Sequence, residues 1–256
     1  MKWIAAALVV SSFGSIAFIS SPRYADTIGT FDKTVTGTYA PVAVLELFTS
    51  EGCSSCPPAD KLLPELAKTD ARVIPLSFHV DYWNYIGWTD PFSSSEFSER
   101  QRGYVQQFKL ESAYTPQLVI NGEYEAVGSN RNKAEAAIKK ALKENAAVGL
   151  QISEVEKSSG KLKCKVATDG DIKKSDLIAA LVQKNATVNV RAGENSGAKL
   201  SHTSVVRTFV SVPAEQVKMI ELPFPVGLAD NNWQLVLYTQ QRGSLKITGA
   251  SVYKPG

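Results

Sequence analysis

The sequence predicts an α/β domain followed by an all-β domain. An apolar run starting at Val42 leads through a polar turn into two cysteines spaced Cys-x-x-Cys, with Pro57-Pro58 directly behind them. Strand-like apolar runs then alternate with helix-like amphipathic stretches as far as Ala146. From Val148 the chain consists of closely spaced strand-like runs separated by turn residues. We therefore expect a mixed sheet flanked by helices over residues 41–146, and a β-sandwich over residues 147–256.

The N-terminal residues have the pattern of a secretory signal peptide. One positive charge at Lys2 precedes an apolar stretch, Ile4–Ile19, that contains no charged residue. We place the signal peptide at residues 1–25 and a polar lead-in at 26–40. Cleavage after Ala17, cleavage after Ala25 and retention as an uncleaved anchor are the alternatives. Export predicts a periplasmic or secreted protein without a stable membrane span after signal removal, in a compartment where a cysteine pair can work as a disulfide.

Composition narrows the classes of partner. The chain has 28 Lys and Arg against 25 Asp and Glu, a net charge of +3. That balance is too weak to indicate nucleic-acid binding, and no basic run with interleaved aromatic residues appears. With only two His and three Cys in the sequence, a closed zinc site is not expected. The leading interpretation needs neither a cofactor nor a metal.

The cysteine pair, Cys53 and Cys56, has the layout of a thiol–disulfide site between a strand and a helix. At the N-terminal edge of a helix, unpaired N–H groups and the helix dipole favour the thiolate of Cys53. Cys56 follows about one turn later, which places the two Cα atoms roughly 5–6 Å apart, within reach of a disulfide. We therefore predict that Cys53 attacks and Cys56 resolves. A static disulfide and two unrelated buried thiols are the alternatives.

The segments after the pair complete the α/β pattern. A helix with three leucines on one face precedes a strand at Arg72–Val80, expected to run parallel to the first strand. Parallel strands end at the same edge of a sheet, so His79 and Asp81 are expected near the thiols. In one interpretation, either His79 or Asp81 accepts a proton from the thiols or tunes their pKa. In the other, both are structural: His79 is a hydrogen-bonded residue at the strand end, and Asp81 caps the next segment. The aromatic stretch Asp81–Trp88 either lines a groove for an extended peptide or packs an insertion.

A second helix and a hairpin follow. Asp90-Pro91 opens a helix with an apolar stripe, and Asn121-Gly122 is a strong hairpin signal between the strands at Tyr114–Ile120 and Glu123–Gly128. An amphipathic helix is predicted at Asn130–Asn145. The order is strand, helix, strand, helix, hairpin, helix.

Residues 42 to about 146 resemble a thioredoxin-fold domain. The resemblance is carried by Cys53-Ser54-Ser55-Cys56 after a strand and by Thr115-Pro116 before the hairpin. It implies that Pro116 is cis and faces the cysteine pair. It also implies that the Thr115 backbone offers its polar groups to an extended substrate. Thioredoxin-like enzymes often keep a buried carboxylate six residues before the first cysteine, where this chain has Leu47. Glu46 points to the opposite face.

The whole chain is similar to a bacterial family of secreted thioredoxin-like proteins catalogued only as a domain of unknown function. Chains of that family pair the motif Thr-Ser-Glu-Gly-Cys-x-x-Cys-Pro-Pro with a downstream Gly-Glu-Asn-x-Gly segment. Here the first motif occupies Thr49–Pro58 and the second occupies Gly193–Gly197.

The second half reads as β-structure throughout. Its expected strands are Val148–Val155, Lys161–Thr168, Leu177–Gln183, Ala186–Val190, Ser204–Val212, Val217–Leu222, Trp233–Tyr238 and Leu245–Tyr253. Cys164 alternates with lysines, so we expect a buried core thiol outside the redox site. His202 is interpreted as a packed strand residue, with a binding role near Arg207 as the alternative.

These observations favour an exported thiol–disulfide oxidoreductase that exchanges with protein thiols or disulfides and with a redox partner that the sequence does not identify. The direction of exchange depends on the reduction potential of the pair. One alternative is a Cu(I) carrier that uses Cys53 and Cys56, with His79 as a third ligand. The other is a redox-inert module that binds a partner and whose disulfide only braces the start of the helix.

Overall fold

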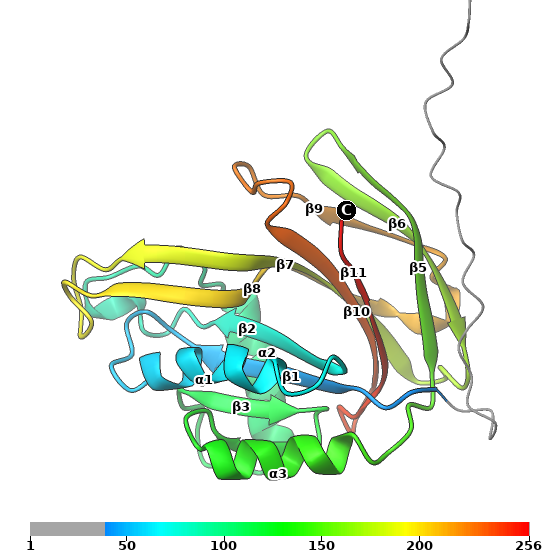
Figure 1. Ribbon diagram of the computed structural model, residues 1–256, viewed down its shortest axis with the longest axis horizontal. Coiled ribbons are helices and arrows are strands. Elements are labelled where there is room, and N and C mark those ends of the chain that lie inside the picture. The colour runs from blue at the N-terminus through cyan, green and yellow to red at the C-terminus, as the bar shows by residue number, and fades with distance from the viewer. Residues whose placement is uncertain (1–38, 256) are drawn as a thin grey trace, which may run out of the picture.

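The computed structural model describes residues 39–255, so the expected signal peptide and most of the lead-in lie outside the described residues. The protein is a mixed α/β structure with a large mixed sheet and a second, antiparallel sheet (Figure 1). Within residues 39–255, no helix is long and apolar enough to cross a membrane. In chain order the helices and strands are β1 (Ala43–Thr49), α1 (Pro57–Ala67), β2 (Val73–His79), α2 (Ser95–Gln107), β3 (Gln117–Ile120), β4 (Tyr124–Val127), α3 (Arg131–Ala141), β5 (Gly149–Ser158), β6 (Lys161–Asp169), β7 (Ser175–Asn189), β8 (Lys199–Pro213), β9 (Met219–Pro223), β10 (Trp233–Gln241) and β11 (Ile247–Tyr253).

Eight strands form the large sheet, in the order β11-β10-β7-β8-β2-β1-β3-β4. Strand β1 runs parallel to β2 and antiparallel to β3, and every residue of β1 is buried. Burial on both faces explains why this strand reads as an almost continuous apolar run. The parallel pairing of the first two strands and the β3–β4 hairpin confirm the expectations for this part of the chain. At the hairpin turn Gly122 has a φ of +67°, and a Cβ there would overlap the carbonyl oxygen of Leu245.

The β-rich half does not form a separate sandwich, which corrects the expectation for residues 147–256. Strand β8 pairs with β2 in parallel through Ser77 and Val205, so strands from both sides of residue 146 share one sheet. Strands β7, β8, β10 and β11 extend that sheet, while β5, β6 and β9 form the second one. The two short strands expected around Lys184 are one strand, β7. The Lys184 amide donates to the carbonyl of Asn232, and this hydrogen bond keeps the backbone extended between the two expected strands.

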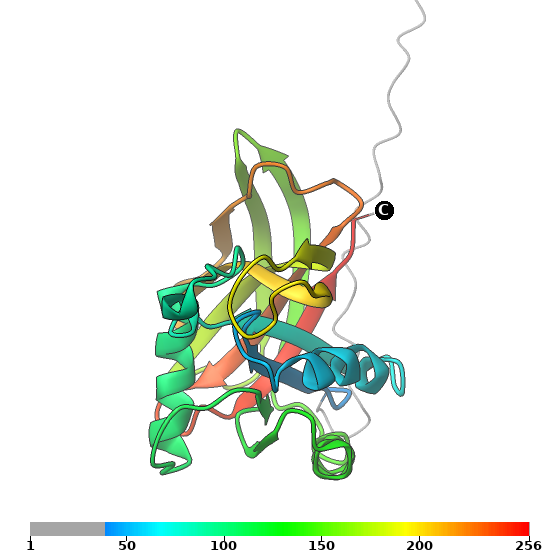
Figure 2. The same ribbon diagram turned by 90° about the vertical axis from the view of Figure 1, so that its left-hand side faces the viewer.

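Three apolar clusters fill the space on the two faces of the large sheet. On one face, helix α2 packs across strands from both halves of the chain. On the other face, α1 and α3 cover the end formed by β1 and β3, and the second sheet covers β7 and β10. Figure 2 shows α2 on the opposite side of the large sheet from α1 and α3. Along β1, β7 and β10, successive residues belong alternately to a cluster on one face and to a cluster on the other, because successive side chains of a strand point to opposite faces of the sheet.

A buried ion pair anchors α2 to the large sheet. Glu46 is fully buried on the α2 side of β1, and Arg100 Nε donates to Glu46 Oε1 at 2.7 Å. Tyr104 and Tyr238 donate their hydroxyls to the same carboxylate. The carboxylate that the resemblance places near the thiols is therefore absent from β1, because Glu46 is engaged on the other face.

The long β7–β8 hairpin carries the second half of the chain to the cysteine pair. Both strands have 15 residues, and their connecting loop extends to the end of the sheet where β1 leads into α1 (Figure 1). This geometry brings Gly193–Gly197 and His202 next to the turn after β1, across about 140 residues of sequence.

Candidate functional site

Cys53 and Cys56 form a disulfide between the end of β1 and the start of α1, with their Cα atoms 5.4 Å apart. The helix begins at Pro57 and Cys56 is its N-cap, so Cys53 lies in the preceding turn and not at the helix edge. Pro57 and Pro58 have no N–H, so the helix-start argument for a reactive thiolate applies weakly to Cys53. Cys53 is 1% exposed and Cys56 is 0% exposed. The roles of the two sulfurs therefore depend on what surrounds each of them.

The Thr115–Pro116 peptide bond is cis, as the sequence predicts, and Thr115 lies beside the cysteine pair. The Ser55 hydroxyl is 3.3 Å from Cys53 Sγ and 3.4 Å from the Thr115 carbonyl oxygen. Trp83 Nε1 donates to Thr115 Oγ1 at 2.8 Å. Thr115, one of the two residues expected to bind substrate, is thus connected to Cys53 through Ser55, which lies between the sulfur and the Thr115 carbonyl.

The aromatic stretch packs the site, as one of its two interpretations expects. A Cβ at Gly52 would lie 3.0 Å from Trp83 Cβ and 3.3 Å from Ile86 Cδ1. Trp88 Nε1 donates to Glu51 Oε2 at 2.7 Å. Tyr85 is 82% exposed, so one aromatic ring of this stretch faces solvent.

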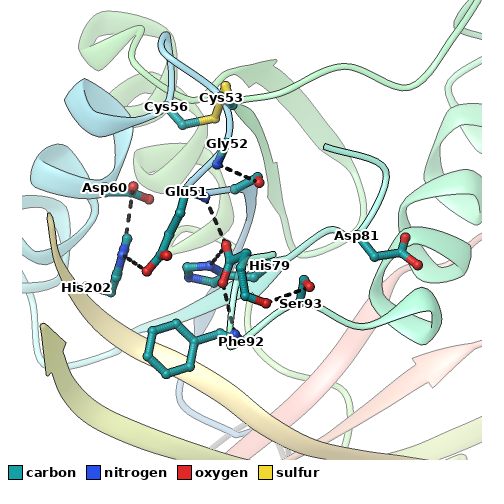
Figure 3. A network of polar contacts seen from close by, with 12 residues as sticks. Glu51, Gly52, Cys53, Cys56, Asp60, His79, Asp81, Phe92, Ser93 and His202 are labelled. Atoms are coloured by element: carbon teal, nitrogen blue, oxygen red, sulfur yellow. Dashed lines mark hydrogen bonds and ion pairs between the residues drawn. A yellow bond between two sulfur atoms is a disulfide. The ribbon is translucent and has the colours of Figure 1, made fainter. Parts of the chain in front are cut away.

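Both histidines of the chain lie in a buried cluster of ionisable side chains on one side of the disulfide (Figure 3). His202 Nε2 is 3.1 Å from Glu51 Oε1, and His79 Nδ1 is 2.7 Å from Asp90 Oδ2. The two imidazole rings are in edge contact, with centroids 4.8 Å apart. Burial is the largest single influence on the pKa of His79 and lowers it, but the charge and hydrogen bond of Asp90, together with the charges of Asp60 and Glu51, outweigh burial and raise the pKa. Burial likewise tends to raise the pKa of Asp90, but the charge and hydrogen bond of His79, together with two backbone hydrogen bonds, lower it.

Asp60 joins this cluster from α1, one helical turn after Cys56. Its backbone amide donates to the Cys56 carbonyl at 3.1 Å, so the two residues share one side of the helix. The carboxylate is buried, and its Oδ2 is 3.6 Å from His202 Nδ1. Neither carboxylate oxygen has a hydrogen-bond partner among the described residues, and the same holds for His202 Nδ1 and His79 Nε2. Burial raises the pKa of Asp60 in spite of the two nearby histidines.

Sequence reasoning found part of this cluster. His79 is there, but Asp81 is not: its carboxylate accepts from Ser98 Oγ at 2.6 Å, and it lies apart from the sulfurs (Figure 3). His202, expected as a packed strand residue, is a member of the cluster. The sequence does carry a signal for Asp60, because it follows Cys56 by four residues and therefore falls on the same side of the helix. Among residues 39–255, no group of three or more His, Cys, Asp or Glu side chains is arranged to hold a metal ion.

The Gly193–Gly197 segment, the second of the two motifs, lies on the turn that carries Cys53. Asn195 Nδ2 donates to the carbonyl oxygens of Glu51, at 2.7 Å, and of Cys53, at 3.0 Å. Glu194 Oε2 accepts from the Ser54 amide at 2.9 Å. Two motifs far apart in the sequence therefore form one site.

Cys164 is outside the site, as predicted. It is 1% exposed on β6, and burial raises the pKa of its thiol to about 11. At neutral pH such a thiol has roughly 100-fold less thiolate than an ordinary cysteine.

We expect alkylation of the reduced protein at mildly acidic pH to label Cys53 first and Cys164 last. Peptide mapping of the labelled protein measures the order. Faster labelling of Cys56 than of Cys53 would reverse the roles predicted for the pair.

One family model covers the residues of both motifs. A family model described as "Protein of unknown function (DUF1223)" matches residues 44–240. The chain belongs to this family. A crystal structure of a protein from Agrobacterium tumefaciens is 30% identical, with a TM-score of 0.63, over 84% of this chain and 96% of that chain. A domain of the outer membrane lipoprotein Omp28 from Porphyromonas gingivalis is 12% identical over 43% of this chain and 88% of that chain. Its TM-score of 0.26 is too low to indicate a shared fold. No curated protein matches the chain.

Proposed function

We propose that this DUF1223 protein is a thiol–disulfide oxidoreductase whose redox pair is Cys53–Cys56. The observation that carries the proposal is a disulfide closed at a helix start, with Thr115–Pro116 on one side and a buried carboxylate, Asp60, behind it. The order of β1, α1, β2, β3, β4 and α3, and their neighbouring places in the sheet, support a thioredoxin-like unit. The proteins on which it acts carry thiols or disulfides of their own, and we place them outside the cytoplasm with it.

In the oxidising direction a substrate thiolate attacks Cys53 Sγ. The Cys53–Cys56 bond breaks, and a mixed disulfide forms between Cys53 and the substrate. Cys56 leaves as a thiolate and takes up a proton. A second substrate thiolate then attacks the substrate sulfur of the mixed disulfide, and Cys53 leaves as a thiolate. Two electrons pass from the substrate to the cysteine pair, and the reverse sequence reduces a substrate disulfide.

Asp60 has the position and the chemistry to exchange the proton of Cys56. It lies one turn along the helix from Cys56, and its raised pKa lets it hold a proton nearer to neutral pH than an ordinary aspartate. Asp60 Oδ2 is 3.6 Å from His202 Nδ1, and the His202 ring is in edge contact with that of His79. These three neighbouring side chains form the proton relay that we propose. The relay thus replaces the carboxylate that the first strand lacks.

Cys56→Ala tests the proposed function. Without its resolving thiol, Cys53 is expected to accumulate mixed disulfides with partner proteins, visible as adducts on diagonal gels of a periplasmic extract. The double variant Cys53→Ala, Cys56→Ala is the control and should show none. A lack of adducts even under oxidative load contradicts the proposal and favours a bracing disulfide. A tight one-to-one Cu(I) complex of the reduced protein, lost in His79→Ala, would favour a carrier instead.

The direction of exchange follows from a second measurement. Equilibration with a series of glutathione buffers determines the reduction potential of the Cys53–Cys56 pair. A value above the potential of the compartment identifies an oxidant, and a value near that of thioredoxin identifies a reductant.

A further inference from the structure

Cys53 is enclosed from two directions although it is the proposed entry point for substrate. In one direction the Ser55 hydroxyl contacts the sulfur and in turn bonds to the Thr115 carbonyl oxygen. In the other, Gly193–Gly197, which we call the cover segment, lies against the backbone of the turn that carries Cys53. With 1% of Cys53 exposed, a substrate sulfur has no open line of approach to it. Disulfide exchange needs such a line, because the attacking sulfur must reach Cys53 Sγ.

The cover segment binds the backbone of the cysteine turn through three hydrogen bonds. Asn195 donates to two carbonyl oxygens, those of Glu51 and Cys53, and Glu194 accepts from the amide of Ser54. These are the kinds of group that an extended peptide uses when it pairs with exposed backbone. The side chains of the cover segment thus occupy the polar backbone groups that a peptide substrate has available on this side of Cys53.

The cover segment can move as one body while the rest of the site stays folded. It is the tip of the β7–β8 hairpin, with positive φ angles at Gly193 (+75°) and Gly197 (+82°). Hydrogen bonds within the tip hold its shape, including Gly197 N to the Val190 carbonyl at 2.9 Å. Its link to the rest of the site is through Glu194, Asn195 and the packing of Gly193 on Ile86 and Trp88. Both Glu194 and Ser54 are exposed, so their hydrogen bond competes with water and breaks at low cost.

We propose that Glu194 and Asn195 determine which thiols reach Cys53. They hold the cover segment closed, and the segment must move away before disulfide exchange can occur. The closed form excludes protein-sized partners more strongly than small thiols. The proposal rests on the proposed function for its biological role. The occlusion itself concerns the Cys53–Cys56 disulfide, whatever the protein reacts with.

The test measures how fast dithiothreitol reduces the Cys53–Cys56 disulfide, with alkylation and mass spectrometry as the readout. Asn195→Ala removes two hydrogen bonds, which should raise the rate roughly tenfold by raising the open population. Glu194→Ala should give a smaller increase, and Glu194→Gln, which keeps the accepting oxygen, should stay near the wild-type rate. Ser196→Ala is the matched control, because the Ser196 hydroxyl bonds to Arg191 within the tip and not to the cysteine turn. The same reduction can be measured with a reduced peptide of about 20 residues in place of dithiothreitol. Asn195→Ala should raise the rate of reduction by a larger factor for the peptide than for dithiothreitol.

Hydrogen exchange separates loss of the cover from loss of the fold. In Asn195→Ala the amides of residues 52–56 should exchange faster while those of β1 stay protected. Reduction rates of Asn195→Ala and Glu194→Ala within twofold of wild type overturn the inference, even if Cys56→Ala traps partners. Faster reduction in Asn195→Ala without any trapped partner leaves the inference standing and contradicts the proposed function instead.

Discussion

Replacing Arg100 with leucine is expected to lower the free energy of unfolding by about 3–5 kcal/mol, the cost of leaving one charge of a buried pair without its partner. Glu46 is fully buried and the Arg100 side chain is 10% exposed, so water does not replace the lost contact. The guanidinium also lies over four aromatic rings, at 5.1 Å from Phe209 and 5.3 Å from Tyr104 among them. Urea denaturation followed by circular dichroism measures the loss.

Arg102→Leu is the control for this prediction. Arg102 is on the same helix and pairs with Glu99, but both side chains are well exposed, so the expected change is below about 1 kcal/mol. The double variant Glu46→Leu, Arg100→Leu should recover part of the stability, because it leaves no charge buried without a partner. Equal losses for Arg100→Leu and Arg102→Leu would show that the buried pair does not anchor α2.

Asp60→Asn is expected to slow the proton-coupled step of exchange by roughly 100-fold near neutral pH, the usual lower size of a general acid–base contribution. Asparagine keeps the shape of the side chain but cannot carry the proton. Five ionisable groups lie in this cluster, so the pH profile of the wild type reports them together. They are Glu51 from the turn, Asp60 from α1, His79 from β2, Asp90 from its loop and His202 from β8. In Asp60→Asn the part of the pH dependence caused by the carboxylate should vanish.

Although Asp60→Asn should slow exchange, it should raise the free energy of unfolding. Burial raises the pKa of Asp60 in the folded protein above the value of about 3.9 in the unfolded chain. Between the two values the folded state binds more protons, so the charged carboxylate reduces stability as the pH rises. The variant lacks this penalty and should be more stable than wild type above the folded pKa. Denaturation curves at pH 4 and pH 8 show whether the gain appears at the higher pH.

Asp81→Asn provides the matched control, because Asp81 follows β2 but bonds to Ser98 on α2. It should leave both the rate and its pH profile unchanged. An Asp60→Asn variant that is slower at every pH by the same factor, with the profile intact, would mean that Asp60 acts through packing and not through a proton.

The parts of the site that lie close together in the sequence could be predicted. The strand before Cys53, the disulfide with Cys56 and the Asn121-Gly122 hairpin all depend on preferences of a few adjacent residues. The buried state of Cys164 followed in the same way from the two-residue period of its strand. The cis bond at Pro116 was instead implied by the resemblance to the thioredoxin fold.

Tertiary structure decided which distant residues join the cysteine pair. The pairing of β8 with β2 depends on contacts between the two halves of the chain, and the local pattern of β8 carries no record of its neighbour. That pairing brings His202 to Glu51 and the tip of the hairpin to the backbone of Cys53. A strand residue such as His202 has the same local pattern whether it packs in a sandwich core or completes a polar cluster. By itself the sequence therefore determined the cysteine pair and its local setting. The fold alone determined the buried cluster around His202 and the contact of the hairpin tip with the cysteine turn, because both depend on long-range pairing of strands.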